Sequence, residues 1–305
     1  MEGVTDAAFR FITAKYGQPD VIFTEFASVD GICSDAGFNK IKIDLQYDKI
    51  ERPIVAQLFG SDPKLFKIAA EKIEKLGFDG VDINMGCPDK SVVKMGAGSA
   101  LILNPDKARG IIKATKEGLK NIPISVKTRI GFEKDTSEQW IPILLDCGIS
   151  ALTIHARTKQ EMWRVPNHFE VYKKIQKYFI GYDTVLIGNG DIDSYHKARE
   201  ISRKYRLDGA MIGRASSGNP WVFSSRARKE NLNIGAILNV MIEHAGTFDK
   251  YFENDKNFVL MNKHFASYLK GNADTKDLKI SLMKAKSAEE AIELMEQFKK
   301  RVLIF

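Results

Sequence analysis

The chain has 305 residues and a mass of 34.3 kDa, enough for one large domain or for a large domain with a small one. Apolar residues make up 44% and charged residues 28%, so the composition excludes an intrinsically disordered chain. No apolar stretch is long enough to span a membrane, and the first residues lack the apolar segment of a secretory signal. The formal charge of +7 fits a polyanionic partner such as nucleic acid, although many basic proteins bind none.

Three cysteines, Cys33, Cys87 and Cys147, are far apart in the sequence and form no Cys-x-x-Cys pair. Because no cluster of cysteine and histidine is present in the sequence, we expect no metal site. An odd, sparse set of thiols is typical of a reducing cytoplasm and leaves at least one thiol free for chemistry. We therefore expect a cytoplasmic protein, and we expect it to be a monomer.

Short β-rich segments alternate with longer amphipathic segments through most of the chain. The predicted strands are residues 21–25, 53–59, 80–84, 124–128, 151–155, 184–188 and 208–212. The predicted helices between them are residues 62–77, 105–119, 137–148, 168–179 and 194–205. Repeated strand–helix units favour a (β/α) barrel of parallel strands, with a doubly wound open sheet as the alternative.

The pattern changes near residue 231, after which β-rich segments are absent from the sequence. The predicted helices there are residues 234–253, 256–270, 275–286 and 287–303. We therefore divide the chain into a barrel domain, residues 1–233, and a small all-helical domain, residues 234–305. Basic and acidic residues are nearly balanced in the helical part, so the net positive charge belongs mainly to the barrel.

A polar side chain stands at the carboxyl end of every predicted strand. A barrel keeps its active site at that end, so we predict that these side chains line one shared pocket. The residues are Glu25, Gln57, Asn84, Lys127, His155, Asn189 with Asp191, and Arg214.

Turns containing glycine follow the last two predicted strands, in residues 187–194 and 211–220. Glycine lets backbone N–H groups approach a phosphate closely, and the N-terminus of a following helix favours the negative charge. Barrels commonly bind phosphate after their last two strands. Either turn alone is equally well explained as a tight connection, but the two together favour a cofactor that carries phosphate.

A long glycine-containing segment, residues 83–101, follows the strand at residues 80–84. It is longer than an ordinary connection in a barrel, and such segments are commonly lids or binding loops. Cys87 lies at its start, which favours a catalytic thiol over a buried structural one. Cys33 and Cys147 lie in apolar helical contexts, so we expect them in the core.

Several motifs, in this order over residues 1 to about 225, resemble the tRNA-dihydrouridine synthase family of bacteria. They are GVTDAAFR, VAQLFG, DINMGCP, GAGSAL, SVKTR, IHART, IGNGDI and DGAMIGRASSGNPWVF. The sequence NMGCP followed by GAGSAL is the most specific part, because the glycine turns also suit other FMN barrels. A weaker resemblance, MNKHFASYLKG at residues 261–271, is to a basic turn in the helical tRNA-binding domain of the family.

The resemblance implies an FMN-dependent oxidoreductase that reduces one uridine in tRNA to 5,6-dihydrouridine with NADPH or NADH. It implies that Cys87 protonates C5 of the uracil while C6 receives a hydride from the flavin. The implied cofactor contacts are Met1, Glu2, Gln57, Lys127, His155, Asn189, Gly190, Asp191, Gly213 and Arg214. The implied substrate contacts are Asn84, Arg129 and Arg157 at the uracil or its phosphate, and Lys263 and His264 in the helical domain.

One departure concerns the start of the chain. Members of the family usually have a strand ending in Ala-Pro-Met at this point, whereas this sequence begins at Met1. The resemblance therefore implies that the first of eight barrel strands is missing, and we expect the N-terminus to be incomplete.

Two alternatives stay open at this stage. One is a small-molecule FMN dehydrogenase of the dihydroorotate dehydrogenase kind, which leaves the helical region without a purpose. The other is a tRNA-binding protein without catalytic activity, for which the short N-terminus is the support.

Overall fold

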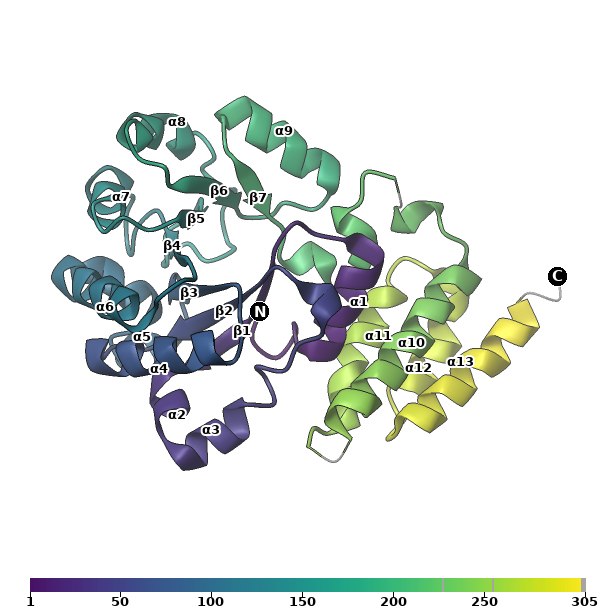
Figure 1. The fold of residues 1–305 in the computed structure, drawn as a ribbon. Helices are drawn as coiled ribbons and strands as arrows, with labels where there is room; N and C mark the ends of the chain where they lie inside the picture. The colour runs from purple at the N-terminus through teal and green to yellow at the C-terminus, as the bar shows by residue number, and fades with distance from the viewer. Residues whose placement is uncertain (227, 254, 303–305) are drawn as a thin grey trace.

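The computed structural model describes residues 1–226, 228–253 and 255–302. Its seven strands are parallel and pair in the order of the sequence, forming one curled sheet (Figure 1). Each lies within a few residues of its predicted position, and the unbroken order excludes a doubly wound sheet, in which the order reverses. The predicted barrel-type fold is confirmed. The strands are β1 (Ile22–Ser28), β2 (Ile54–Phe59), β3 (Gly80–Met85), β4 (Ile124–Arg129), β5 (Ala151–His155), β6 (Val185–Asn189) and β7 (Gly209–Met211).

Helices cover the outer face of this sheet (Figure 1). The α-helices of this part are α1 (Ala7–Gly17), α2 (Val29–Cys33), α3 (Asp35–Ile41), α4 (Pro63–Lys75), α5 (Lys90–Lys94), α6 (Pro105–Gly118), α7 (Ser137–Leu145), α8 (Val171–Ile175) and α9 (Tyr195–Tyr205). Short 3-10 segments are η1 (Lys49–Glu51), η2 (Gly98–Leu103), η3 (Gln176–Phe179), η4 (Arg214–Ser216), η5 (Pro220–Phe223) and η6 (Lys229–Asn231). Helix α4 shows why the segments begin where they do, because Asp62 caps the N–H of Lys64 and Pro63 opens the first turn.

The C-terminal part is helical, as predicted. It consists of α10 (Ile234–Phe252), η7 (Phe258–Met261), α11 (Asn262–Tyr268), η8 (Ala273–Thr275), α12 (Lys276–Leu282) and α13 (Ala288–Val302). Residue 303, the predicted end of the last helix, and residues 304 and 305 of the predicted domain lie outside the described residues. These helices pack beside α1 at one side of the sheet (Figure 1). No helix among the described residues is long and apolar enough to cross a membrane.

Helix α1 was not predicted, and it joins the two parts of the molecule. Its residues Ala7, Ala8 and Ile12 belong to the apolar core of the C-terminal helices, whereas the strands and the surrounding barrel helices form a separate core. Arg10, on the same helix, is buried and pairs with buried Glu51 of η1 (Nε to Oε2, 2.7 Å). The buried face of α1 therefore includes polar residues. The helix lacks a continuous apolar stripe, which is the pattern by which a helix is predicted from sequence.

The edge strands β1 and β7 are not hydrogen-bonded to each other within the described part of the chain. The N-terminal residues lie between them. The N–H of Val4 donates to Oε1 of Glu25 on β1 (2.8 Å), and a β-carbon added at Gly213, after β7, would lie 3.7 Å from Sδ of Met1. The first residues thus contact both edges of the sheet, next to the carboxyl ends of the strands.

Candidate active site

The polar side chains predicted to share a pocket do meet at one edge of the sheet. In the parallel register, Asn84 lies beside Lys127 and His155 beside Asn189. The ammonium of Lys127 on β4 donates to Oδ1 of Asn189 on β6 (3.1 Å), so one contact spans the intervening strand. The amide of Asn189 also donates to the carbonyl of Met211 on β7 (2.8 Å). Hydrogen bonds therefore connect the ends of strands β4, β6 and β7 directly.

A second set of hydrogen bonds places the backbone of Cys87. The amide of Asn84 donates to Oε1 of Gln57 (2.9 Å), and its Oδ1 accepts from the N–H groups of Gly86 (3.1 Å) and Cys87 (2.8 Å). Asn84, predicted to contact substrate, therefore also holds the turn that carries the thiol.

The segment after Cys87 differs from the open loop that its length and glycines suggest. It contains the short helices α5 and η2, and the residues Ala97, Gly98 and Ser99 where η2 begins are buried. The N–H of Ser99 donates to the carbonyl of Cys87 (3.1 Å), and Gly98 (φ 58°) approaches so closely that a β-carbon there would lie 2.9 Å from that oxygen. In this structure the segment fixes Cys87 in place, because it packs against the residue rather than standing away from it.

Burial sets the charge state of the groups around the thiol. It raises the pKa of Cys87 above its usual value, and the nearby positive charges of Arg129 and Lys127 oppose this only in part. Burial, followed by repulsion from Arg129, lowers the pKa of Lys127 to about 8. The thiol is therefore protonated at neutral pH, beside two cationic side chains.

His155 is held neutral. Burial lowers its pKa to about 2, and the surrounding cations Lys127, Arg129 and Arg157 contribute in the same direction. Its Nε2 atom is buried and has no hydrogen-bond partner among the described residues. A neutral imidazole with a free ring nitrogen can donate to or accept from a bound molecule at this position.

The turn after β6 has an unusual backbone that depends on glycine. Gly190 (φ 122°) and Asp191 (φ 44°) are both left-handed, and a β-carbon at Gly190 would lie 2.1 Å from Oδ1 of Asn167, so only glycine fits. The carboxylate of Asp191 pairs with Arg157 and with Arg214, which lowers its pKa. This carboxylate is neutralised on both sides, so it does not prevent an anion from binding nearby.

Arg129 ties the loops at the ends of β3 and β5 together, and Arg157 connects the β5 loop to Asp191 after β6. Arg129 is buried and donates to the carbonyls of Gly86 (2.7 Å) and Thr158 (3.0 Å). Burial lowers its pKa to about 10, so it stays charged at neutral pH. Nη1 of Arg157 is buried without a hydrogen-bond partner in the described chain, which leaves one donor free beside the Gly190 turn.

The remaining predicted positions fall at the side nearest the helical part. Met1 and Glu2 lie in the N-terminal stretch, and Nζ of Lys263 on α11 lies 4.0 Å from where a β-carbon of Gly3 would be. His264, the next residue, is instead fully buried, with its ring 4.9 Å from that of His244 and 5.6 Å from that of Phe9. Burial lowers its pKa well below the usual value. The structure therefore does not place His264 on a surface that tRNA could reach, nor as a cation.

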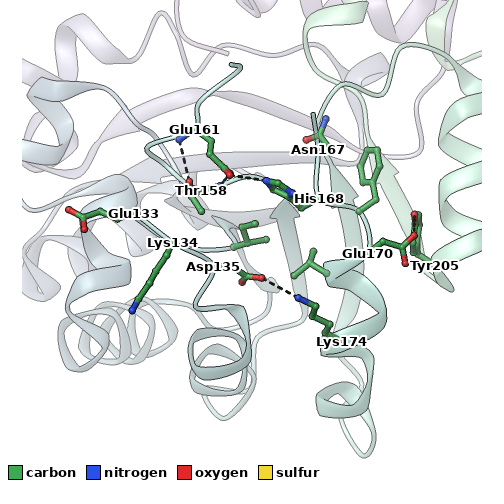
Figure 2. Close-up of a pocket in the computed structure, with 13 residues that line it drawn as sticks. Glu133, Lys134, Asp135, Thr158, Glu161, Asn167, His168, Glu170, Lys174 and Tyr205 are labelled. Carbon is green, nitrogen blue, oxygen red and sulfur yellow. Dashed lines mark hydrogen bonds and ion pairs between the residues drawn. The ribbon is translucent and has the colours of Figure 1, made fainter. Parts of the chain in front are cut away.

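A cavity of about 770 Å³ lies next to this edge, between the loops that follow β4 and β5 (Figure 2). Nε2 of His168 and Oε1 of Glu161 are hydrogen-bonded at this cavity (2.8 Å), and the N–H of Thr158 donates to Oε2 of the same carboxylate (2.8 Å). Neither Cys87 nor Lys127 lines this cavity. It therefore adjoins the strand-end site through Thr158 without being part of it.

Sequence analysis missed Asp82 and Ser125, which lie below the site. Asp82 is fully buried in β3, where Oδ1 accepts from the hydroxyl of Ser125 (2.6 Å) and Oδ2 from Nε2 of Gln57 (2.8 Å). The available signal was an acidic residue inside an otherwise apolar strand, because a buried carboxylate needs dedicated partners.

The architecture is a barrel-type α/β fold whose strand ends carry a protonated thiol, several cationic side chains and a glycine turn. Among solved structures, the histamine dehydrogenase from Rhizobium sp. 4-9 has a TM-score of 0.50 and 12% identity, covering 79% of this chain and 46% of that one. At this identity the likeness concerns the fold alone.

Sequence relatives specify the family. The family model for dihydrouridine synthase (Dus) matches residues 1–303. A probable tRNA-dihydrouridine synthase of Staphylococcus aureus (strain MRSA252) is 36% identical, covering 98% of this chain and 91% of the relative. Probable tRNA-dihydrouridine synthase 2 of Bacillus subtilis (strain 168) is 34% identical, covering 99% and 93%. The chain belongs to the dihydrouridine synthase family, oxidoreductases that act on uridine in tRNA, and membership implies a flavin cofactor.

Proposed function

We propose that this enzyme reduces one uridine of tRNA to 5,6-dihydrouridine with FMN as its flavin and NADPH as the reductant, and that Cys87 protonates C5. The observation that supports this most directly is the placement of Cys87. Its backbone is fixed by Asn84 at the carboxyl edge of the sheet, and its thiol is kept protonated beside Lys127 and Arg129. The proposed reduction needs a proton donor for C5, and barrel active sites lie at this edge of the sheet.

The residues at the strand ends fit an FMN. Nε2 of His155 and Nη1 of Arg157 are buried polar atoms without partners among the described residues. A glycine turn such as that at Gly190 can present backbone N–H groups that donate hydrogen bonds to a phosphate. We assign the flavin ring to Gln57, Lys127, His155 and the N-terminal stretch, and its phosphate to the two glycine turns. The full set is Met1, Glu2, Gln57, Lys127, His155, Asn189, Gly190, Asp191, Gly213 and Arg214.

When bound, FMN supplies the hydride that adds to C6 of the uracil. The protein side chains supply the proton and the positive charge. Cys87 gives its thiol proton to C5, and the raised pKa of the thiol ensures that this proton is present at neutral pH. Lys127 and Arg129 place positive charge beside the site, which stabilises both a reduced flavin and the thiolate that remains after proton transfer. The thiolate then recovers a proton from solvent for the next cycle.

The substrate base has to leave its stack to reach a thiol at the end of a barrel strand. We assign Asn84, Arg129 and Arg157 to the uracil or its phosphate, and Lys263 to the tRNA backbone from the helical domain, residues 234–305. Lys263 is partly exposed and faces the N-terminal residues at the rim of the site, which supports this assignment. His264 no longer belongs to this set because its ring is buried. We further propose that the protein acts as a monomer in the cytoplasm, where its tRNA substrate is.

The test is reduction of an unmodified tRNA transcript by the purified protein with NADPH, and in parallel with NADH. Dihydrouridine is then mapped by position, and flavin content is measured by absorbance. We expect dihydrouridine at one position and faster turnover with NADPH. A protein that binds FMN and oxidises NADPH but leaves every uridine of its natural tRNAs intact would contradict the proposal.

A further inference from the structure

Asp82 is a buried carboxylate that none of the roles above uses. It lies in the middle of β3 with no exposed surface, level with Gln57 on β2 and Ser125 on β4. Each of its two oxygens accepts one hydrogen bond, from Ser125 Oγ (2.6 Å) and from Gln57 Nε2 (2.8 Å). An ionised carboxylate is costly to bury, so a carboxylate kept here needs a reason beyond packing.

The bond to Gln57 determines which way its amide faces. A carboxylate can only accept, so the NH₂ group of Gln57 has to point at Asp82 and its Oε1 has to point away. That oxygen accepts from Nδ2 of Asn84 (2.9 Å), which leaves Oδ1 of Asn84 facing the turn. There it accepts from the N–H groups of Gly86 and Cys87.

The groups at the two ends of this chain of hydrogen bonds require the same orientation of the Gln57 and Asn84 amides. At one end stands an acceptor, Asp82, and at the other stand two backbone donors, which can only donate. If the amide of Gln57 rotated by half a turn, its NH₂ group would face the NH₂ group of Asn84. Asn84 would then have to rotate too, and both N–H groups of the turn would lose their acceptor.

We propose that Asp82 is a positioning residue that orients the amides of Gln57 and Asn84 and thereby holds the turn that carries the Cys87 thiol. Asp82 acts through Gln57 and Asn84, and the structure gives it no contact with Cys87 itself. The importance of this placement for catalysis rests on the proposed role of Cys87, but the hydrogen-bond relay itself does not.

The variants separate hydrogen-bond polarity from charge. Asp82→Leu removes the acceptor while keeping the number and branching of the side-chain heavy atoms, so Gln57 is no longer oriented. Asp82→Asn removes the charge but keeps an acceptor, since its Oδ1 can face Gln57 while its NH₂ group faces the Ser125 hydroxyl. Ser125→Ala removes the other bond to the same carboxylate and lies outside the relay, so it controls for a general loss of stability.

The readout is the rate at which iodoacetamide alkylates Cys87 in the holoenzyme, with Cys33 and Cys147 replaced by serine. A net hydrogen bond corresponds to roughly fivefold in an equilibrium constant, and the turn loses two when the relay fails. We expect Asp82→Leu to be alkylated at least about fivefold faster than the parent, and Asp82→Asn and Ser125→Ala within about twofold of it. The parent protein from which the flavin has been removed shows how far flavin loss alone changes the rate.

Two results would overturn the proposal. One is an alkylation rate of Cys87 in Asp82→Leu that does not exceed the rate in the flavin-free parent. The other is an equal increase in the alkylation rate of Cys87 in Asp82→Asn and Asp82→Leu. The charge of Asp82, and not its role as a hydrogen-bond acceptor, would then be responsible. If Asp82→Leu does not fold, Gln57→Met interrupts the relay at the next residue. The alkylation rate of Cys87 in Gln57→Met is then judged by the same criterion. Uridine reduction by the Cys87→Ala variant is measured separately, so failure of the relay and failure of the proposed chemistry are distinguishable.

Discussion

Two groups of buried polar side chains in this protein are built in opposite ways. At the strand ends, Asp82, Gln57 and Asn84 form a continuous chain of hydrogen bonds that ends on the Cys87 backbone. Where α10 and α11 meet α1, His244 and His264 are just as buried, yet three of their four ring nitrogens have no partner among the described residues.

The difference shows what each group does. A directional chain of donors and acceptors has one satisfied arrangement, so it fixes the geometry of whatever it ends on. The histidine rings instead pack against Phe9 and Tyr268 as neutral aromatic groups, and burial lowers the pKa of His244 to about 3. Burial of a polar residue type therefore does not by itself separate a structural role from a functional one, and its neighbours have to be considered.

The largest effect on stability is expected from breaking a buried pair that is fully partnered. Glu51→Ala leaves the buried guanidinium of Arg10 without its carboxylate, and such a loss typically costs about 3–5 kcal/mol. Urea unfolding at pH 7 measures it. Glu117→Ala, in the half-exposed pair with Lys67, serves as the control and should change stability by less than about 1 kcal/mol. Equal effects would show that the Arg10–Glu51 pair contributes no more than a surface contact.

An intermediate effect is expected from acid on the histidine pair. In the folded protein the pKa values of His244 and His264 are lowered, so the unfolded chain binds more protons once the pH falls below about 6.5. Their contribution to stability is complete above that pH and is lost as the pH falls towards 3. At pH 5 we expect His264→Leu to recover about 2 kcal/mol of the loss seen in the parent. If the stabilities of variant and parent changed by the same amount between pH 7 and 5, His264 would have the same pKa in the folded and unfolded chain, which would contradict this account.

The smallest effect is expected from exposed cations on the helical part. Lys263→Ala with Lys270→Ala should weaken tRNA binding and reduce the slope of log affinity against log salt by about 2, since each phosphate contact contributes about 1. Filter binding over a range of salt concentrations measures this. An unchanged slope would place the tRNA contacts elsewhere. His264→Leu should leave the slope unchanged, because its ring does not reach the surface.

The sequence predicted the strands well because parallel strands buried on both faces are almost continuously apolar. It also predicted that polar strand ends would meet, since the strand ends of a barrel share one rim. It did not predict α1, whose buried face carries Arg10 and Thr13 and so lacks a clear apolar stripe. The cap at Asp6, whose Oδ1 accepts from the N–H of Phe9 (2.9 Å), was a local signal for it.

Long-range packing accounts for the other differences. The basic turn at Lys263 and His264 resembles a tRNA contact in sequence. In the structure Lys263 is partly exposed, whereas His264 is buried in the aromatic core. The segment after Cys87 has the glycines of a lid, yet Gly98 is needed because the Cys87 carbonyl approaches it. Both outcomes depend on contacts with distant or folded-back segments, which local patterns do not contain.

The most direct test of this account is the Cys87→Ala variant, compared with Cys33→Ala and Cys147→Ala. Flavin content, flavin bleaching by NADPH and dihydrouridine formation in tRNA are measured for all three. Removing a general acid typically costs about 10² to 10⁴-fold, so we predict that Cys87→Ala binds and reduces its flavin normally but forms dihydrouridine slower by that factor. The two other variants, whose thiols donate to the carbonyls of Leu65 and Ile143, should react at the parental rate. Dihydrouridine formation by Cys87→Ala at near the parental rate would contradict the central claim, because another group would then be the acid.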